Sequence, residues 1–177
     1  MPGRGVKDAA GLLMLAGAAI ATAAQPPRLA LTGSGYTIGG QTARFAATTR
    51  VAAIVQVSAV LGKPLETGSH GDCGQGDVIG FAKFRGGFEL SFVKGRLSGW
   101  TVDGPIPRTG RGIGVGTTVA QLRKAYPDVD FDPGDEANGG LGPQFGRDGG
   151  PNGWLQGVRS GDRVVGMFAG ATCLAGV

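Results

Sequence analysis

The chain has 177 residues, and its 36 Gly and 10 Pro make up about a quarter of it, against a usual share of about 12 %. That content argues against a helical bundle, because Gly and Pro are the poorest residues for a helix interior. The apolar share of 41 %, the charged share of 17 % and the net charge of +4 predict one folded domain with a modest core. One His and two Cys exclude most zinc sites and every framework of several disulfides.

Residues 1–24 have the three parts of a secretory signal peptide. Arg4 and Lys7 precede an uncharged, alanine-rich run over residues 10–24, and Ala21-Thr22-Ala23 is a small-x-small cleavage pattern. A retained membrane anchor is the alternative, but the run is short for a bilayer span of about 20 apolar residues. We therefore expect cleavage after residue 23 or 24, no stable membrane span afterwards, and a secreted or periplasmic protein.

The mature chain, residues 25–177, carries a net charge of 15 − 12 = +3, because the signal removes two basic residues and one acidic residue. This charge is small and no basic run is present, so the sequence predicts no nucleic-acid partner. No Cys lies near the cleavage site, so we expect no lipid anchor.

A first helix is predicted to begin at Thr48-Thr49. Its apolar positions follow helical spacing at Val51, Ile54, Val55 and Leu61. Gly62 is suited to the left-handed cap, and Pro64 prevents the helix from continuing.

A first hairpin is predicted after this helix. Phe88, Leu90 and Phe92 alternate with less apolar residues, and the turn Lys94-Gly95 leads into a return strand over 96–100. A two-residue turn would pair Phe92 with Leu97 and Leu90 with Gly99. This register places Trp100 opposite Glu89 on the outer face, where an indole is a candidate contact residue for a partner. The alternative is that a helix or loop covers Trp100.

A second helix and hairpin repeat this order in shorter form. Thr117-Thr118 is a candidate N-cap, with Val119, Leu122 and Tyr126 on one face and Pro127 at the end. Around the turn 160–162, Val158 would pair with Val164 and Gln156 with Gly166. The chain is therefore predicted to be a single α+β domain of two similar halves, about 36–104 and 105–173, each a helix followed by an antiparallel meander. The helices would cover one sheet face and leave the other partly open.

Cys73 and Cys173 form an even pair, one in each half. In an oxidising compartment a structural disulfide is the plain interpretation. The alternative is a catalytic Cys73 thiol, since His70 lies three residues before it, although such a pair must face each other in space.

The segments Thr49–Pro64, with Leu61-Gly62-x-Pro64, and Gly112–Thr117 resemble the tandem small α+β repeats of secreted bacterial proteins. Examples are the β-lactamase-inhibitory proteins and the small outer-membrane assembly lipoproteins. The resemblance covers most of residues 36–173 as a pattern, and implies a protein that binds other proteins or the envelope and does no chemistry. Unlike the lipoproteins, this chain has no Cys after its signal.

Several other motifs give weaker evidence for a functional site. The Gly-rich run 110–118 lacks the glycine and lysine spacings of dinucleotide-binding and P-loop motifs, so it is predicted to be a turn with a helix cap, or a weak anion site at free amides. The acidic stretch 128–138 does not fit an EF-hand, which leaves a solvated loop or an irregular calcium site. His70 is predicted to be a surface loop residue. Asp77, Glu89 and Asp103 remain open as a carboxylate pair of a glycoside hydrolase.

The sequence thus predicts a secreted or periplasmic, non-enzymatic protein that binds a protein or envelope component through an open sheet face. No catalytic, cofactor-binding or metal-binding residue is assigned. A small secreted hydrolase is the alternative.

Overall fold

The computed structural model describes residues 28–71, 73, 77–134 and 142–173, and this part of the chain forms two helices and two β-sheets. The predicted α+β class is therefore confirmed. The eight-stranded sheet has the strand order β4-β5-β6-β7-β12-β11-β10-β9, with every neighbouring pair antiparallel. Its strands are β4 (Glu66–His70), β5 (Ile79–Phe84), β6 (Phe88–Val93), β7 (Arg96–Val102), β9 (Asp130–Asp132), β10 (Gln144–Gly146), β11 (Asn152–Leu155) and β12 (Val164–Gly170).

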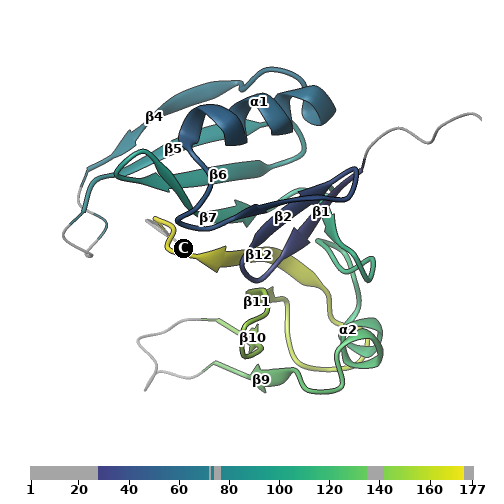
Figure 1. The fold of residues 1–177 in the computed structure, drawn as a ribbon. Helices are drawn as coiled ribbons and strands as arrows, with labels where there is room; N and C mark the ends of the chain where they lie inside the picture. The colour runs from purple at the N-terminus through teal and green to yellow at the C-terminus, as the bar shows by residue number, and fades with distance from the viewer. Residues whose placement is uncertain (1–27, 72, 74–76, 135–141, 174–177) are drawn as a thin grey trace, which may run out of the picture.

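The second sheet has four short strands in the order β3-β2-β1-β8. It consists of a meander of β1 (Leu29–Thr32), β2 (Gly35–Ile38) and β3 (Gln41–Arg44), with β8 (Arg108–Thr109) parallel to β1. The sequence did not predict this sheet. It lies beside α1 against one face of the large sheet (Figure 1), and one hydrophobic core extends from Leu29 to Ala169 between these layers.

Helix α1 (Arg50–Leu61) has the predicted ends. The Thr49 side chain accepts from the Ala52 amide at 3.2 Å, and Gly62 has a φ of 81° at the C-cap. The predicted apolar face is only partly correct. Leu61 is buried and Ile54 packs against the core, as predicted. Val51 and Val55, however, are 73 % and 64 % exposed, and Ala53 and Val57 are buried in their place.

Helix α2 (Val119–Ala125) also begins at its predicted cap. Thr118 and Gln121 form a capping box, in which each side chain satisfies the other residue's backbone amide. Val119 and Leu122 are buried as expected. The helix ends before Pro127, whose ring cannot continue it.

The β6–β7 hairpin has the predicted turn but a different register beyond it. Lys94 and Gly95 have φ of 49° and 73°, and Phe92 pairs with Leu97 as predicted. A β-bulge then follows, so Gly99 pairs with Ser91 and Trp100 pairs with Leu90. The extra residue moves every later side chain of β7 to the other face of the sheet.

Trp100 is therefore not a contact residue, and this prediction is corrected. Its side chain is fully buried beneath the four-stranded sheet. Its indole N–H donates to the carbonyls of Thr32 at 3.0 Å and Gly35 at 2.9 Å, at the two ends of the β1–β2 turn. The alternative, that a helix or loop covers the indole, is correct in that the β1–β2 turn of the second sheet lies over it.

The β11–β12 hairpin also differs from its predicted register. Leu155 pairs with Val164 and Trp154 pairs with Gly166, again across a bulge. The longer connecting loop folds over α2, and its Asp162 carbonyl accepts from the Val119 amide at 2.8 Å. The loop satisfies amides at the start of the helix rather than extending the hairpin.

The predicted disulfide between Cys73 and Cys173 is present, with a Cα–Cα distance of 5.3 Å. The segment after β12 runs along β7, where Ser98 and Ala171 exchange hydrogen bonds of 2.9 Å. The bond therefore ties the C-terminal segment to the loop that follows β4. Among the described residues no helix is both long and apolar enough to cross a membrane.

Candidate functional site

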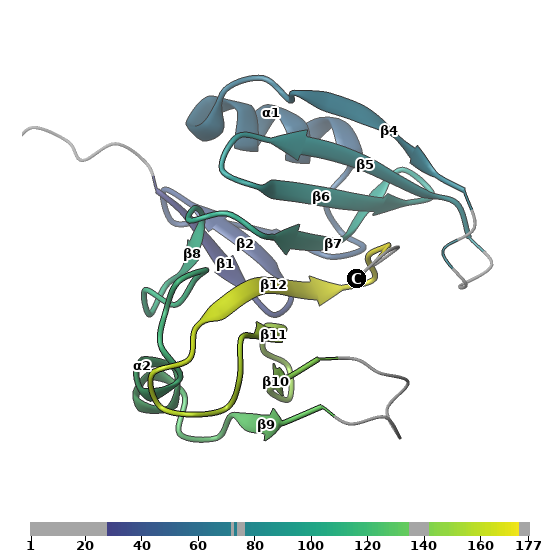
Figure 2. The ribbon, with the colours of Figure 1, turned by 180° about the vertical axis from the view of Figure 1, so that it is seen from behind.

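One face of the large sheet is free of helices and of the second sheet (Figure 2). Directly opposed residues of antiparallel strands point to the same face, so the register defines a row across five neighbouring strands: Glu66, Lys83, Glu89, Thr101 and Phe168. We call the face that carries this row the open face. None of these five side chains is fully buried, in contrast to the core face of the same strands.

The row ends in an aromatic pair. Trp154 and Phe168 have ring centroids 4.8 Å apart and are both half-buried. Gly166 makes room for the indole, because a Cβ at that position would lie 2.8 Å from a Trp154 ring carbon. These large, half-exposed rings on a sheet are the side chains most often used as binding anchors. Sequence analysis missed them as a site, because the bulge determines which side Trp154 faces.

The opposite end of the row is charged. Lys83 Nζ lies 3.1 Å from Glu66 Oε2, and His70 Nε2 lies 3.4 Å from Glu89 Oε1. The hydrogen bond to Glu66 and the negative charges of Glu66, Glu89 and Asp103 raise the pKa of Lys83. This end is therefore a network of opposite charges, in which the lysine stays protonated at neutral pH.

Phe81 forms the apolar base of this charged end. The His70 ring stacks on it with centroids 4.5 Å apart, and Lys83 Nζ lies 5.1 Å from its ring centroid. His70 was predicted to be a surface loop residue, but it closes strand β4 and is half-buried. Cys73 is in the disulfide and His70 faces Glu89, so the alternative of a Cys–His catalytic pair is wrong.

A hollow of about 360 Å³ lies at the charged end, lined in part by Lys83, Glu89, Thr101 and Asp103. It brings together two of the three carboxylates that the sequence left open for a hydrolase. The third, Asp77, instead lies 3.4 Å from Lys94 Nζ.

The Gly-rich run 110–118 is a turn with a helix cap, as predicted. The amides of Gly112, Ile113, Gly114 and Gly116 all donate within the chain, and so do those of Thr117 and Thr118. These six amides are therefore not free to hold an anion, as the alternative of a weak anion site would require of them.

The acidic stretch 128–138 is only partly described. Asp128 accepts from Arg147 Nε at 2.7 Å, and this hydrogen bond lowers the pKa of Asp128. Asp130 and Asp132 belong to β9, while residues 135–138 lie outside the described residues. Within the described part, no three His, Cys, Asp or Glu side chains gather closely enough to hold a metal ion.

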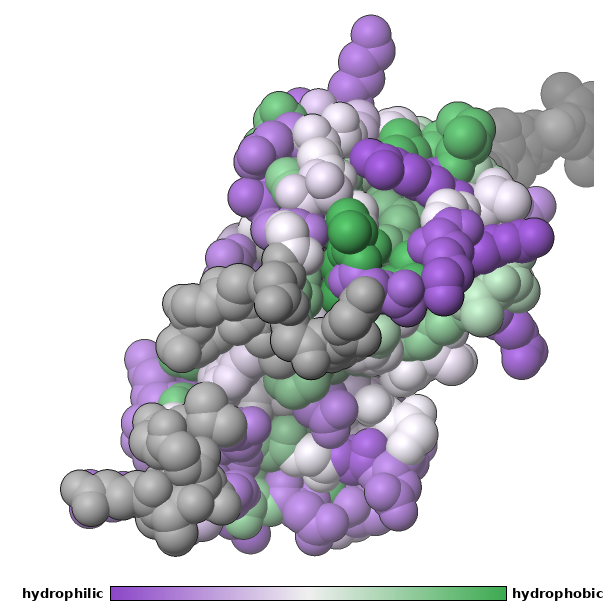
Figure 3. All heavy atoms as spheres, turned by 90° about the vertical axis from the view of Figure 1, so that its left-hand side faces the viewer, coloured by the Kyte–Doolittle hydropathy of each residue, from purple (hydrophilic) through white to green (hydrophobic). Residues whose placement is uncertain are grey.

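Figure 3 shows the molecule from the left of Figure 1. Hydrophobic side chains appear there as separate green areas among hydrophilic ones, over the described surface of that side. Comparisons with protein-family models, with curated proteins and with solved structures found no match for this chain.

Proposed function

We propose that the protein is a secreted or periplasmic, non-enzymatic binding protein that contacts a protein or envelope component through the open face. One observation carries this proposal. The Trp154–Phe168 pair stands half-exposed in a row of polar and charged side chains, on a sheet whose other face is filled by the core. A rigid sheet presents such anchors with little loss of side-chain freedom on binding.

Export is supported by two features. The sequence of residues 1–24 has the parts of a signal peptide, although these residues lie outside the described ones. The Cys73–Cys173 disulfide fits an oxidising compartment. Mass spectrometry of protein exported by its host should give a chain that begins at Ala24 or Gln25. An intact Met1 in that fraction would contradict export by cleavage.

We also propose that the two halves are tandem repeats. In each half the N-cap threonine forms a bridge with an arginine at the entry to the last strand. Thr49 pairs with Arg96, the first residue of β7, and Thr118 pairs with Arg163, the residue before β12. Each arginine also donates through Nη1 to the carbonyl two residues before its cap, at 3.0 Å and 2.7 Å.

The bulges and the sheet order support the same relation. Each last hairpin has its bulge at the corresponding place, where Gly99 and Gly166 occupy equivalent positions. Strands β4 to β7 and β9 to β12 meet at their last strands, β7 and β12. This arrangement supports the resemblance to tandem-repeat binding proteins, and it joins the two groups of four strands into one sheet.

The binding proposal is tested by capture from an envelope extract with purified, disulfide-intact protein. Phe168→Ser should reduce the recovered partner at least tenfold, because it removes one of the two anchors. Val55→Ser is the control, since it removes an apolar side chain that is 64 % exposed, and so more exposed than Phe168, from α1 on the other side of the molecule. Equal recovery with all three proteins would reject the open face as the binding surface.

The hollow beside Lys83 supports the second candidate, a small secreted hydrolase, because Glu89 and Asp103 both line it. Turnover of generic glycoside and ester substrates by the purified protein, abolished by Asp103→Asn, would replace binding as the function. We expect no turnover, because Lys83 and His70 pair with carboxylates at this end of the row.

A further inference from the structure

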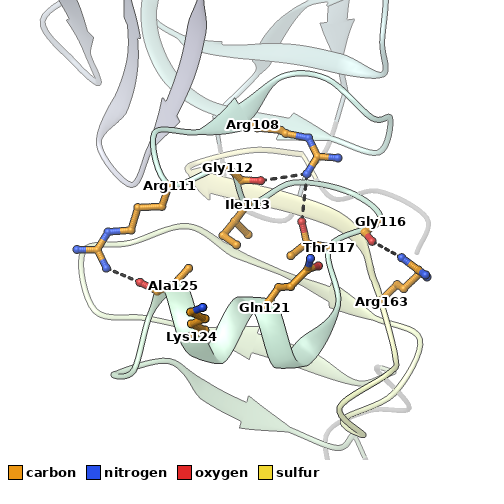
Figure 4. A pocket seen from close by; sticks show the side chains of 10 residues that line it. All are labelled: Arg108, Arg111, Gly112, Ile113, Gly116, Thr117, Gln121, Lys124, Ala125 and Arg163. Carbon is orange, nitrogen blue, oxygen red and sulfur yellow. Dashed lines mark hydrogen bonds between the residues drawn. The ribbon is translucent and has the colours of Figure 1, made fainter.

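A second concave surface lies away from the open face, between the Gly-rich turn and α2 (Figure 4). It encloses about 630 Å³ and is lined by four cationic side chains, Arg108, Arg111, Lys124 and Arg163, with no carboxylate among its lining residues. The side chains come from β8, the turn, the end of α2 and the residue before β12, so the fold collects charges that are distant in the sequence.

Within the described chain no carboxylate forms an ion pair with these four side chains, and Asp128, on which the charge of Arg111 acts, is paired with Arg147. The ion pairs found there involve His70, Lys83, Lys94 and Arg147, and none involves a lining residue of this pocket. Within the same residues, Lys124 is exposed and has neither an ion pair nor a hydrogen bond through its ammonium group. Such an unbalanced cluster attracts an anion.

The arginines are held in place by neutral acceptors. Arg108 Nη1 donates to the Gly112 carbonyl at 3.0 Å and to Thr117 Oγ1 at 3.2 Å. Arg163 Nη1 donates to the Gly116 carbonyl at 2.7 Å, and Arg111 donates to the Ala125 carbonyl. A guanidinium has five N–H donors, so these bonds fix each group and leave donors for a ligand.

We propose that this pocket binds a phosphate group through its arginine and lysine side chains. Guanidinium groups match the oxygen spacing of phosphate, and lysine adds a point charge. The amides of Gly112, Ile113, Gly114 and Gly116 take no part because they already donate within the chain. The phosphate could be free or belong to a lipid headgroup, and the experiment separates these sources. This site is independent of the open face and of the function proposed for it.

The test uses the full mature protein with its disulfide intact. Isothermal titration at low ionic strength with inorganic phosphate and pyrophosphate should show binding, and chloride at equal ionic strength should not replace it. Lys124→Glu should weaken binding at least tenfold, because it reverses a charge that holds no bond of its own. Lys63→Glu, an equal charge change at another exposed lysine, should alter binding less than twofold.

Sedimentation with phosphatidylglycerol and phosphatidylcholine vesicles distinguishes the source. Retention on the anionic vesicles alone, lost in Lys124→Glu, assigns the site to a lipid phosphate. Binding of soluble phosphate without vesicle retention assigns it to a free phosphate. The proposal is overturned if wild-type protein binds neither probe, or if Lys124→Glu and Lys63→Glu weaken binding equally. Urea midpoints of both variants confirm that they remain folded.

Discussion

Replacing Trp100 by Phe should destabilise the fold while leaving the open face intact. The indole N–H donates to the Thr32 and Gly35 carbonyls at 3.0 Å and 2.9 Å, and thereby fastens the small sheet to the large one. Leaving buried acceptors without their donor costs about 1–3 kcal/mol. The smaller ring leaves a cavity that adds about 1 kcal/mol. We expect a loss of about 2–4 kcal/mol in the free energy of unfolding.

Trp154→Phe is the matched control, because it makes the same change in a half-exposed ring that still contacts Phe168. Its cost should stay below about 0.5–1 kcal/mol. Urea unfolding followed by circular dichroism compares the two. Acrylamide should quench Trp154 in the Trp100→Phe protein much more strongly than Trp100 in the Trp154→Phe protein. If Trp154→Phe is the more damaging change, or Trp100 is the more easily quenched, the assignment of the two faces is wrong.

Gly99→Val should lower the free energy of unfolding by about 2–3 kcal/mol, because a Cβ there would lie 2.6–2.7 Å from the carbonyl oxygens of residues 171 and 169. Ser98→Val should lower it by about 1 kcal/mol, through one lost hydrogen bond. Equal urea midpoints of the two variants would contradict the bulge register. The double variant Cys73→Ala/Cys173→Ala should have a free energy of unfolding lower by about 4–5 kcal/mol on the chain-entropy model, since the disulfide closes a loop with a sequence separation of 100. An unchanged urea midpoint would show that the disulfide does not stabilise the fold. Burial raises the pKa of the Tyr36 phenol, so this phenol loses its proton at a lower pH in the unfolded chain than in the folded one. The free energy of unfolding should therefore fall above about pH 10, by about 1.4 kcal/mol per pH unit. Urea unfolding of wild type and Tyr36→Phe at increasing pH tests this, and an identical dependence on alkaline pH in the two proteins would refute it.

The local elements of this protein were predictable because their signals are local. Thr49 and Thr118 cap the two helices at the predicted residues, and Gly62 ends the first helix. The Lys94-Gly95 turn follows from backbone conformations that Gly readily adopts. The first apolar pair after that turn, Phe92 with Leu97, was also correct.

The open face was not predictable residue by residue, because one bulge reverses it. Phe88, Leu90 and Phe92 were assigned correctly to the core. The extra residue in β7 then places Trp100 with them, where the alternation alone placed it outside. The corresponding bulge in the second hairpin places Trp154 over Gly166 on the open face. No short-range pattern in the sequence predicted either bulge.

The sequence by itself determined the α+β class, the positions of both helices and the partners of the disulfide. Composition and the number of cysteines are properties of the whole chain, and a helix cap depends on a few neighbouring residues. None of these signals depends on which distant residues meet. The tertiary structure decided which residues meet. It placed the small sheet over Trp100 and brought four cationic side chains from separate elements to one pocket. It also aligned one row of residues on the open face: Glu66, Lys83, Glu89, Thr101 and Phe168. These outcomes depend on strand register and on packing between layers, which arise from contacts between residues far apart in the chain.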